Sequence, residues 1–317
     1  MTPGMGPAFS APYVQFYPTT RCNLACSFCF NRGLPTIEDV EVDAFRRMVS
    51  LFHREGIGWV DFLGGEPTLH PNLDALLDIV RDRHMRCNLS SNGTRVDLLE
   101  FLSKRYEKDF LKIGVSLQDT AVSAELHEYI LSRRPVLKSL MERNGAIPAG
   151  CEVYADMAGI EYFLLFRDAV GPEDLDECMP FPTYHRRLSL LRKAHPGIRG
   201  VFCDGFIENG ALSGALRPVR CPAGTTKLSM LPDGSVYPCY LLFRYPEFAL
   251  GNILRDGFQR IWENPILRFF RTFSHDSCPE KDCSFSPSCH GGCPAHGYAL
   301  YHDLTAPDPR CVFPFHH

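Results

Sequence analysis

Hydrophobic and polar positions over the first 200 residues follow two alternating patterns. Short apolar runs, typical of buried strands, are separated by segments in which apolar residues recur at helical spacing. The strands are expected at residues 13–17, 57–63, 86–91, 111–117, 151–156 and 161–166. The helices are expected at residues 42–52, 73–80, 98–106, 122–143 and 181–194. This order predicts an α/β fold with a parallel sheet.

The alternation breaks once, between residues 151–156 and 161–166, because four residues are too few for a crossover helix. Either the sheet is irregular there or these two runs form a hairpin. Six expected strands predict a partial, TIM-like (β/α)6 barrel over residues 13–200, with functional side chains at the C-terminal ends of its strands. Residues 201–317 then form a second, smaller domain, and residues 1–12 a flexible tail.

Composition and charge exclude several classes of protein. Of 317 residues, 45% are hydrophobic and 22% charged, which is ordinary for a soluble globular protein. No apolar run reaches the roughly 18 residues of a membrane helix, and the N-terminus lacks the features of a signal peptide. We therefore expect a cytoplasmic protein without a membrane partner. The net charge of -4 and the lack of a basic stripe give no reason to expect a nucleic-acid partner.

The 14 cysteines add candidate chemistry. In a reducing compartment such cysteines indicate metal binding or catalysis rather than disulfides. Cys22, Cys26 and Cys29 stand at C-x3-C-x2-C spacing directly after the first strand. Three thiolates in one loop can hold three irons of a [4Fe–4S] cluster and leave the fourth iron open. Taken alone, they also fit an incomplete zinc site or part of a disulfide framework.

Two further motifs follow the next strands. Gly64-Gly65-Glu66-Pro67 ends the second strand and combines bare backbone with a carboxylate. Asn88, Ser90 and Asn92 alternate along the third strand, so they are expected on one face, pointing into the barrel.

The cysteine loop, followed one strand later by the Gly-Gly-Glu-Pro turn, resembles the signature of the radical S-adenosylmethionine (radical SAM) enzymes. The resemblance implies that SAM chelates the open iron and is cleaved by one electron to methionine and a 5′-deoxyadenosyl radical. It implies a flavodoxin- or ferredoxin-type reductant as partner. The implied SAM-binding residues are Phe28, Gly64, Gly65, Glu66, Asn88, Ser90, Asn92, Ser116 and Gln118. Gln118 departs from the family, in which many members have Asp.

The composition changes to glycine, proline and cysteine from Cys221 onward. Residues 232–234, Pro-Asp-Gly, predict a β-hairpin turn, and a helix is expected at residues 258–270. Seven cysteines at ordered spacing resemble the SPASM domain, which binds two auxiliary iron–sulfur clusters and would bring the total to three [4Fe–4S] clusters. The resemblance implies Cys221, Cys239 and Cys293 as ligands of auxiliary cluster I. It implies Cys278, Cys283, Cys289 and Cys311 as ligands of auxiliary cluster II, although the first gap is wider than usual.

The fourth ligand of auxiliary cluster I is left open by the sequence. Cys203 is one candidate, and an open or non-cysteine iron site, which we favour slightly, is the other. A zinc knuckle over residues 278–293 competes by spacing alone.

Auxiliary clusters near the barrel's mouth could accept a second electron, so we expect a net two-electron oxidation that uses a general base. The candidates for the base are Asp119, Asp156, Glu161, Asp168 and Asp204, with Cys203 as a base or hydrogen donor. The sequence favours dehydrogenation of a small natural-product intermediate, such as an aminocyclitol alcohol, because only about a dozen residues precede the first strand and leave no room for a peptide-recognition domain. The alternative is a peptide or protein maturase, for crosslinking, epimerisation or sulfatase-type formylglycine formation. A remote third hypothesis is a non-catalytic electron carrier or zinc scaffold.

Overall fold

The computed structural model describes residues 13–117, 122–203, 205–207, 221–273, 278–280, 282–286 and 289–312. Its centre is a sheet of ten strands in the order β10-β9-β8-β1-β2-β3-β4-β5-β6-β7. The first seven strands run parallel to their neighbours. They are β1 (Tyr13–Phe16), β2 (Trp59–Phe62), β3 (Arg86–Ser91), β4 (Leu111–Ser116), β5 (Val136–Leu140), β6 (Tyr162–Leu165) and β7 (Ile198–Val201).

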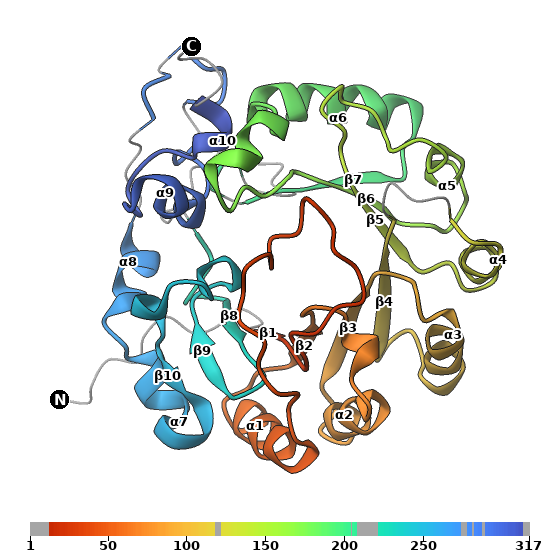
Figure 1. Ribbon diagram of the computed structural model, residues 1–317, viewed down its shortest axis with the longest axis vertical. Helices are drawn as coiled ribbons and strands as arrows, with labels where there is room; N and C mark the ends of the chain where they lie inside the picture. Colours follow the sequence, from red (N-terminus) through yellow and green to blue (C-terminus); the bar gives the residue numbers. More distant parts are fainter. Residues whose placement is uncertain are drawn as a thin grey trace.

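Helices surround the curved sheet on its outer side (Figure 1). They are α1 (Val42–Arg54), α2 (Leu73–Arg81), α3 (Val96–Arg105), α4 (Ala124–Arg133), α5 (Glu152–Ala155) and α6 (Phe181–Ala194). The helical spacing in α1 buries Phe45, Met48, Val49 and Phe52 as expected, and the Phe45 ring stacks on Phe16 of β1 at 4.8 Å. The prediction of a barrel-like α/β fold with a parallel sheet is confirmed.

The sequence prediction was wrong between residues 122 and 156. The helix expected at 122–143 ends at Arg133, because Arg134 adopts a left-handed φ of 50° and Pro135 follows it. The next residues form β5, and the strand expected at 151–156 is the short helix α5, which buries Tyr154 and Ala155. The expected break in alternation therefore disappears, since α5 lies in the crossover between β5 and β6.

A seventh parallel strand was also missed. The sequence analysis expected no strand between the helix at residues 181–194 and Cys221, but β7 pairs with β6 and α6 packs on it. The strand is short and contains Gly200, which weakens its sequence signal. A Cβ on Gly200 would lie 2.3 Å from Leu188 Cδ2, so the glycine allows the close approach of α6.

The C-terminal part continues the same sheet. β8 (Lys227–Met230) and β9 (Ser235–Tyr237) form the expected antiparallel hairpin, and β10 (Gly251–Asn252) pairs with β9. β8 also runs parallel to β1, so the hairpin extends the barrel sheet. The helix expected at 258–270 is two helices, α7 (Ile253–Trp262) and α8 (Ile266–Thr272), separated at Pro265. Two further helices follow, α9 (Pro294–Tyr301) and α10 (Pro309–Val312).

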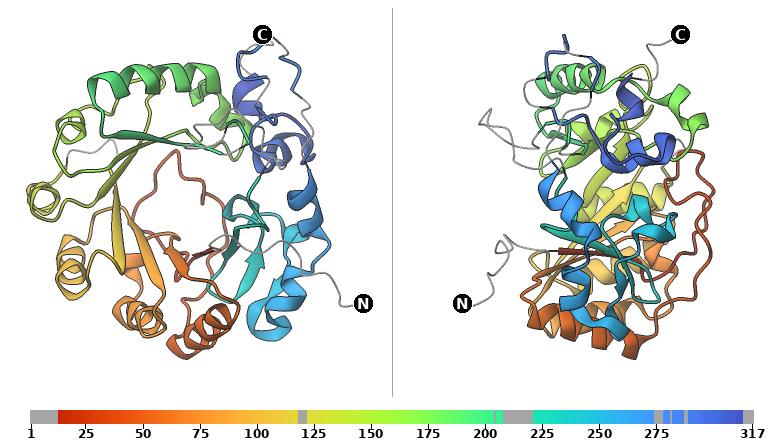
Figure 2. Two further views of the ribbon diagram at one scale, coloured as in Figure 1. Left: turned by 180° about the vertical axis from the view of Figure 1, so that it is seen from behind. Right: turned by 90° about the vertical axis from the view of Figure 1, so that its left-hand side faces the viewer.

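The segment between β1 and α1 crosses the mouth of the barrel in Figure 1, and the edge-on view of Figure 2 places it along one side of the molecule. Parallel strands end together at this side, which is where α/β barrels carry their functional groups. None of the described helices is both long enough and apolar enough to span a membrane.

Candidate functional site

The three N-terminal cysteines lie in the segment that crosses the barrel's mouth. The backbone N–H of Cys29 donates to Cys26 O at 3.1 Å, and Arg32 N–H donates to Cys29 O at 3.1 Å, so the chain turns tightly around these thiols. The N–H of Leu24 donates to Cys22 Sγ at 3.5 Å. Burial, with a smaller effect of the nearby Cys22, raises the pKa of the Cys29 thiol. Turns that aim N–H groups at sulfur suit cysteines that carry negative charge as ligands.

Two glycines allow this segment to pack directly on the end of β2. Gly65 N–H donates to Thr19 O at 3.2 Å, and Glu66 N–H donates to Arg21 O at 2.8 Å. A Cβ on Gly65 would lie 2.1 Å from Arg21 O, and one on Gly64 would lie 2.5 Å from Thr19 O. Gly64 also has a φ of +134°, which residues with a side chain rarely adopt. The glycines of the Gly-Gly-Glu-Pro turn therefore set how closely the cysteine segment approaches the barrel.

Replacing Gly65 by alanine should displace the cysteine segment, because the opposing atom is backbone and cannot rotate away. We expect the loss of about four of about twelve irons per chain and a fall of about a hundredfold in SAM cleavage, as for a catalytic group misplaced by about an ångström. Iron analysis and 5′-deoxyadenosine formation measure both effects. Gly58→Ala is the matched control, since a Cβ there meets nothing within 4 Å. Wild-type iron content and cleavage in Gly65→Ala would contradict the argument.

The carboxylate of Glu66 connects the glycine turn to β3. Glu66 is 1% exposed, and it accepts hydrogen bonds from Thr68 Oγ1 at 2.6 Å and from the backbone N–H of Asn92 at 2.6 Å. Asn92 Nδ2 donates to Asn23 Oδ1 at 2.9 Å and lies 3.9 Å from Cys22 Sγ. Glu66 and Asn92, both expected to bind SAM, are thus hydrogen-bonded to each other, and Asn92 is also hydrogen-bonded to the cysteine segment.

A row of polar side chains lines the inner face of the barrel below this point. Asn88 Nδ2 donates to Asp61 Oδ1 at 2.5 Å, and Lys138 Nζ donates to Ser90 Oγ at 2.6 Å. Lys138 is on β5 and reaches across β4 to β3. A Cβ on Gly114 of β4 would lie 2.7 Å from Lys138 Cε, so the glycine makes room for the lysine. Asn88 and Ser90 therefore face inward as expected.

Lys138 was missed by the sequence analysis because residues 136–140 were assigned to a helix, and Asp61 was not singled out within the strand expected at residues 57–63. Burial raises the pKa of Asp61 and lowers that of Lys138, and each group partly opposes the shift of the other. Lys227 of β8 also acts on the charge of Asp61, so ionisable groups of both signs come together in the interior. Ser116 lies at the end of β4 in register with Lys138. Gln118 lies outside the described residues.

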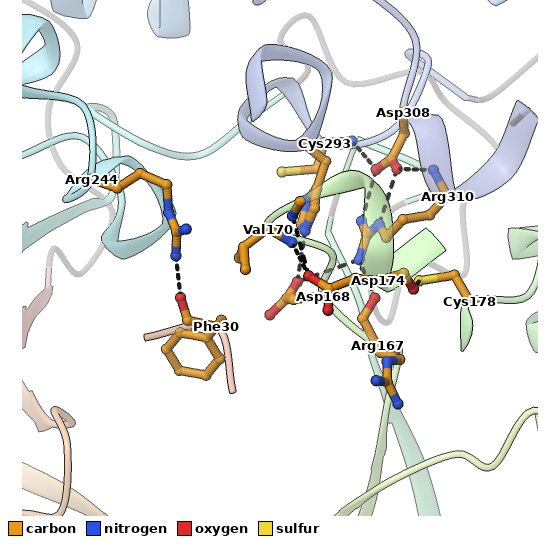
Figure 3. A network of polar contacts seen from close by, with 12 residues as sticks. Phe30, Arg167, Asp168, Val170, Asp174, Cys178, Arg244, Cys293, Asp308 and Arg310 are labelled. Carbon is orange, nitrogen blue, oxygen red and sulfur yellow. Dashed lines mark hydrogen bonds and ion pairs between the residues drawn. The ribbon is translucent and has the colours of Figure 1, made fainter. Parts of the chain in front are cut away.

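Phe28, one of the residues expected to bind SAM, is half-buried in the cysteine segment, and the Arg167 guanidinium lies 6.0 Å from its ring centre. Arg32 Nη2 donates to Asp174 Oδ1 at 2.9 Å. Arg244 Nη2 donates to Phe30 O at 2.5 Å, as Figure 3 shows. The cysteine segment is therefore tied both to the chain beyond β6 and to the C-terminal part.

The candidates for the general base lie in different parts of the structure relative to the cysteine segment. Asp156 and Glu161 are exposed and precede β6, so they lie at the opposite end of the strands from the cysteine segment. Asp156 was expected at the end of a strand, but it follows helix α5 and pairs with His195 at 2.6 Å. These two are not brought to the site. Asp119 and Asp204 lie outside the described residues. Asp168 follows β6, so it lies at the C-terminal end of the strands, which is the end that the cysteine segment crosses.

Asp168 belongs to a buried network that the sequence did not reveal (Figure 3). Its Oδ1 lies 3.1 Å from His296 Nε2 and 3.4 Å from Arg310 Nη1. Arg310 Nη2 donates to Asp308 Oδ2 at 2.7 Å, and the same oxygen accepts the backbone N–H of Cys293 at 2.9 Å. The network therefore joins the end of β6 to one of the cysteines expected at auxiliary cluster I.

The charges in this network are set by burial and by its own members. Burial and Arg310 lower the pKa of His296, but Cys293 and Asp168 outweigh them and raise it to about 9. Burial raises the pKa of Asp308, but Arg310 outweighs it and brings the value to about 2. At neutral pH the network thus pairs two cations with two carboxylates.

The cysteines of the C-terminal part form two groups. Cys221, Cys239 and Cys293 are buried in one apolar cluster, with Cys203 packed against it. In the second group, burial raises the pKa of Cys311 to about 12, and nearby Cys278 and Cys289 add to this shift. The place of Cys283 beside these three stays a prediction.

One tyrosine lies between the N-terminal and C-terminal cysteines. Tyr17 is fully buried, and its hydroxyl donates to Asn31 Oδ1 at 2.9 Å. Burial raises its pKa, and both Cys239 and Cys29 are close enough to raise it further. The first cysteine loop and the first C-terminal group therefore face the same side chain.

Comparison with known proteins agrees with this arrangement. A sequence model of the radical SAM superfamily matches residues 16–142, and a model of the SPASM iron–sulfur cluster-binding domain matches residues 221–293. The antilisterial bacteriocin subtilosin biosynthesis protein AlbA of Bacillus subtilis (strain 168) is 26% identical, over 89% of this chain and 66% of its own length. The chain thus spans just under two thirds of that relative.

Two further similarities extend over nearly the whole chain. The mycofactocin maturase MftC of Mycobacterium tuberculosis (strain ATCC 25618 / H37Rv) is 27% identical, over 93% of this chain and 81% of its own length. The crystal structure of Streptococcus suis SuiB bound to precursor peptide SuiA superposes with a TM-score of 0.74 and 16% identity, over 96% of this chain and 76% of that one. The second similarity establishes the fold alone.

A parallel, barrel-like sheet with a three-cysteine loop across its mouth and a cysteine-rich C-terminal part defines an iron–sulfur enzyme. The chain belongs to the radical SAM superfamily and carries a C-terminal SPASM domain. The two domains imply [4Fe–4S] clusters and S-adenosylmethionine as its cofactors.

The described cysteines fit such clusters. Those at positions 22, 221 and 289 each accept a backbone N–H from the residue two positions later, at 3.5, 3.4 and 3.3 Å. Hydrogen bonds to the sulfurs are among the features that set the potential of iron–sulfur clusters. No three described His, Cys, Asp or Glu side chains are arranged to hold a single metal ion.

Proposed function

We propose that this protein is a radical SAM maturase that oxidises a peptide substrate by two electrons, with an auxiliary cluster as electron acceptor. The substrate would lose a hydrogen atom, then one electron and one proton. This balance corresponds to the formation of a crosslink, a ring or an unsaturated bond.

The N-terminal half supports the first step. Cys22, Cys26 and Cys29 would hold a cluster with one open iron, and with SAM bound this group supplies a 5′-deoxyadenosyl radical. Gly64 and Gly65 fix the distance between that loop and the barrel. Lys138 places a positive charge inside the barrel, which suits a carboxylate of SAM or of the substrate.

The C-terminal half supports the second step. Cys29 and Cys239 are both close enough to buried Tyr17 to raise its pKa, so the two predicted cluster sites lie near the same side chain. An electron leaving the substrate then has a nearby acceptor. Among the described candidate carboxylates, Asp168 is the one at the C-terminal end of β6, and its ion pairs with His296 and Arg310 keep it ionised, as a group that receives a proton must be.

The observation that carries the choice of a peptide is the pair of relatives matched along most of this chain. AlbA is named for the biosynthesis of a bacteriocin and MftC for the maturation of mycofactocin. These names favour the peptide alternative over the small-molecule dehydrogenation that the sequence favoured. The relation at 26–27% identity extends over 89–93% of the chain, so it includes both the barrel and the cysteine-rich part.

The test is anaerobic reconstitution with iron and sulfide, followed by incubation with SAM, dithionite and deuterated substrates. One set is a library of ribosomal precursor peptides, and the other a set of aminocyclitols. We expect deuterium in 5′-deoxyadenosine and a mass loss of two hydrogens from a peptide only. Label transfer from an aminocyclitol would instead support the dehydrogenase, and SAM cleavage absent under all conditions would support a non-catalytic protein.

A further inference from the structure

The structure assigns to Cys203 the fourth ligand position of auxiliary cluster I. This inference rests on the proposed function only in taking the C-terminal cysteines as iron–sulfur ligands. It goes beyond the ordered pattern of seven cysteines, which lacks this residue. It also reverses the slight preference for an open iron drawn from the sequence.

The first observation is the position of the thiol. Cys203 follows β7 by two residues, yet its thiol contacts those of Cys221 and Cys293. Cys239 is close enough to Cys293 for its charge to be felt there. Four cysteines from the chain after β7, the β8 and β9 hairpin region and the start of α9 therefore converge on one place.

The second observation is that Cys203 has the hydrogen bonding of a ligand. Its Sγ accepts the backbone N–H of Gly205 at 3.4 Å, which is the same bond, from two residues later, that Cys22 and Cys221 accept. Cys178 provides the contrast, because its thiol donates to Asp174 O at 3.4 Å. The accepted N–H is the feature that prepares a sulfur for negative charge, since Cys289, expected at auxiliary cluster II, also accepts one although its thiol donates to Gly205 O at 3.7 Å.

The third observation is that the turn carrying Cys203 is fixed to the C-terminal cysteines. Phe206 N–H closes the turn on Cys203 O at 3.1 Å. The carbonyl of Gly205 accepts the N–H groups of His290 at 2.9 Å and Gly292 at 3.2 Å. The loop that leads into Cys293 thus holds the turn, so the backbone that carries the Cys203 thiol is fixed next to the C-terminal cysteines.

Cys203, Cys221, Cys239 and Cys293 would together provide four thiolates for one [4Fe–4S] cluster, formed as each thiol loses its proton. With all four irons held by protein, substrate cannot bind to this cluster. Its function is then electron transfer, and Cys203 is neither the general base nor the hydrogen donor considered from the sequence.

The test uses the full chain with the triple substitution of Cys22, Cys26 and Cys29 by alanine, so that only auxiliary clusters contribute to the spectra. The reduced, reconstituted protein is examined by electron paramagnetic resonance before and after addition of cyanide, which binds an open iron. The same measurement is made after adding Cys203→Ala, and separately Cys178→Ala as a matched control for a buried cysteine.

We expect no cyanide response in the parent protein or with Cys178→Ala. Cys203→Ala should respond to cyanide, or lose about one iron per chain and show a three-iron signal on oxidation. A cyanide response in the parent, which needs no further variant, would overturn the assignment. Identical spectra and iron content for Cys203→Ala and its parent would also overturn it. Failure of the wild-type chain to bind iron and sulfide at all would instead refute the proposed function.

Discussion

Replacement of Cys22, Cys26 and Cys29 together by alanine is expected to abolish reductive SAM cleavage. The three thiolates are the protein ligands available in the segment that crosses the barrel's mouth, and no redox-inactive side chain can supply the electron that breaks SAM. Iron should fall from about twelve to about eight per chain, with the auxiliary clusters retained. Iron and sulfide analysis, together with 5′-deoxyadenosine formation under dithionite, measures both effects.

The matched control for this prediction is Cys278→Ala. It removes a thiol expected at auxiliary cluster II, which is near Cys289 and Cys311 and lies in the C-terminal part of the chain. We expect it to preserve SAM cleavage but to impair substrate turnover, since only the second electron is affected. SAM cleavage by the triple variant at the wild-type rate would show that the radical chemistry does not depend on the N-terminal loop.

The sequence was sufficient to predict the barrel wherever the local pattern and the tertiary structure agree. Helix α1, strand β3 and the hairpin turn at Asp233-Gly234 have strong periodicity or turn residues, and each was placed correctly. The region after β4 failed because only Arg134 and Pro135 separate α4 from β5, so the two elements were interpreted as one continuous helix. Pro135 was the available signal, since a helix rarely continues through the residue before a proline.

In the candidate site, too, the features that are local in sequence could be predicted and those that depend on tertiary structure could not. The cysteine spacings and the Gly-Gly-Glu-Pro turn are local in sequence, so they can be recognised from the order of residues alone. The interior pair of Asp61 and Lys138 cannot, because it joins strands separated by more than seventy residues across Gly114. Spacing identified seven C-terminal cysteines, whereas the contact of Cys203 with Cys221 depends on how β7 is placed. Convergence of distant residues is a tertiary property that no single-sequence pattern contains.

The barrel and the cysteine-rich part are joined by more than a linker. β8 pairs with β1, Arg244 holds the carbonyl of Phe30, and the Asp168 network reaches Cys293. Each connection brings the C-terminal cysteines toward the mouth of the barrel. One sheet thus contains strands from both sides of residue 200, and the domain boundary expected there stays a prediction.

Arg310→Met is expected to cause the largest loss of stability among single substitutions in this network. Arg310 is 2% exposed, and its guanidinium donates to Asp308 at 3.0 and 2.7 Å and to Arg167 O at 2.8 Å. Methionine fills much of the same volume but leaves the Asp308 carboxylate buried without its cation. Breaking a buried pair in this way costs on the order of 3–5 kcal/mol.

The midpoint of urea unfolding, followed by circular dichroism on the anaerobic holoprotein, measures this loss. Arg260→Met is the matched control, because its partner Asp256 is 3.5 Å away and the arginine side chain is 79% exposed. Exposed pairs contribute at most about 1 kcal/mol. Adding Asp308→Asn to Arg310→Met should recover part of the lost stability, since the unpaired charge is then removed. Equal, small effects of Arg310→Met and Arg260→Met would show that the network is not the buried connection between β6 and Cys293 that the contacts indicate.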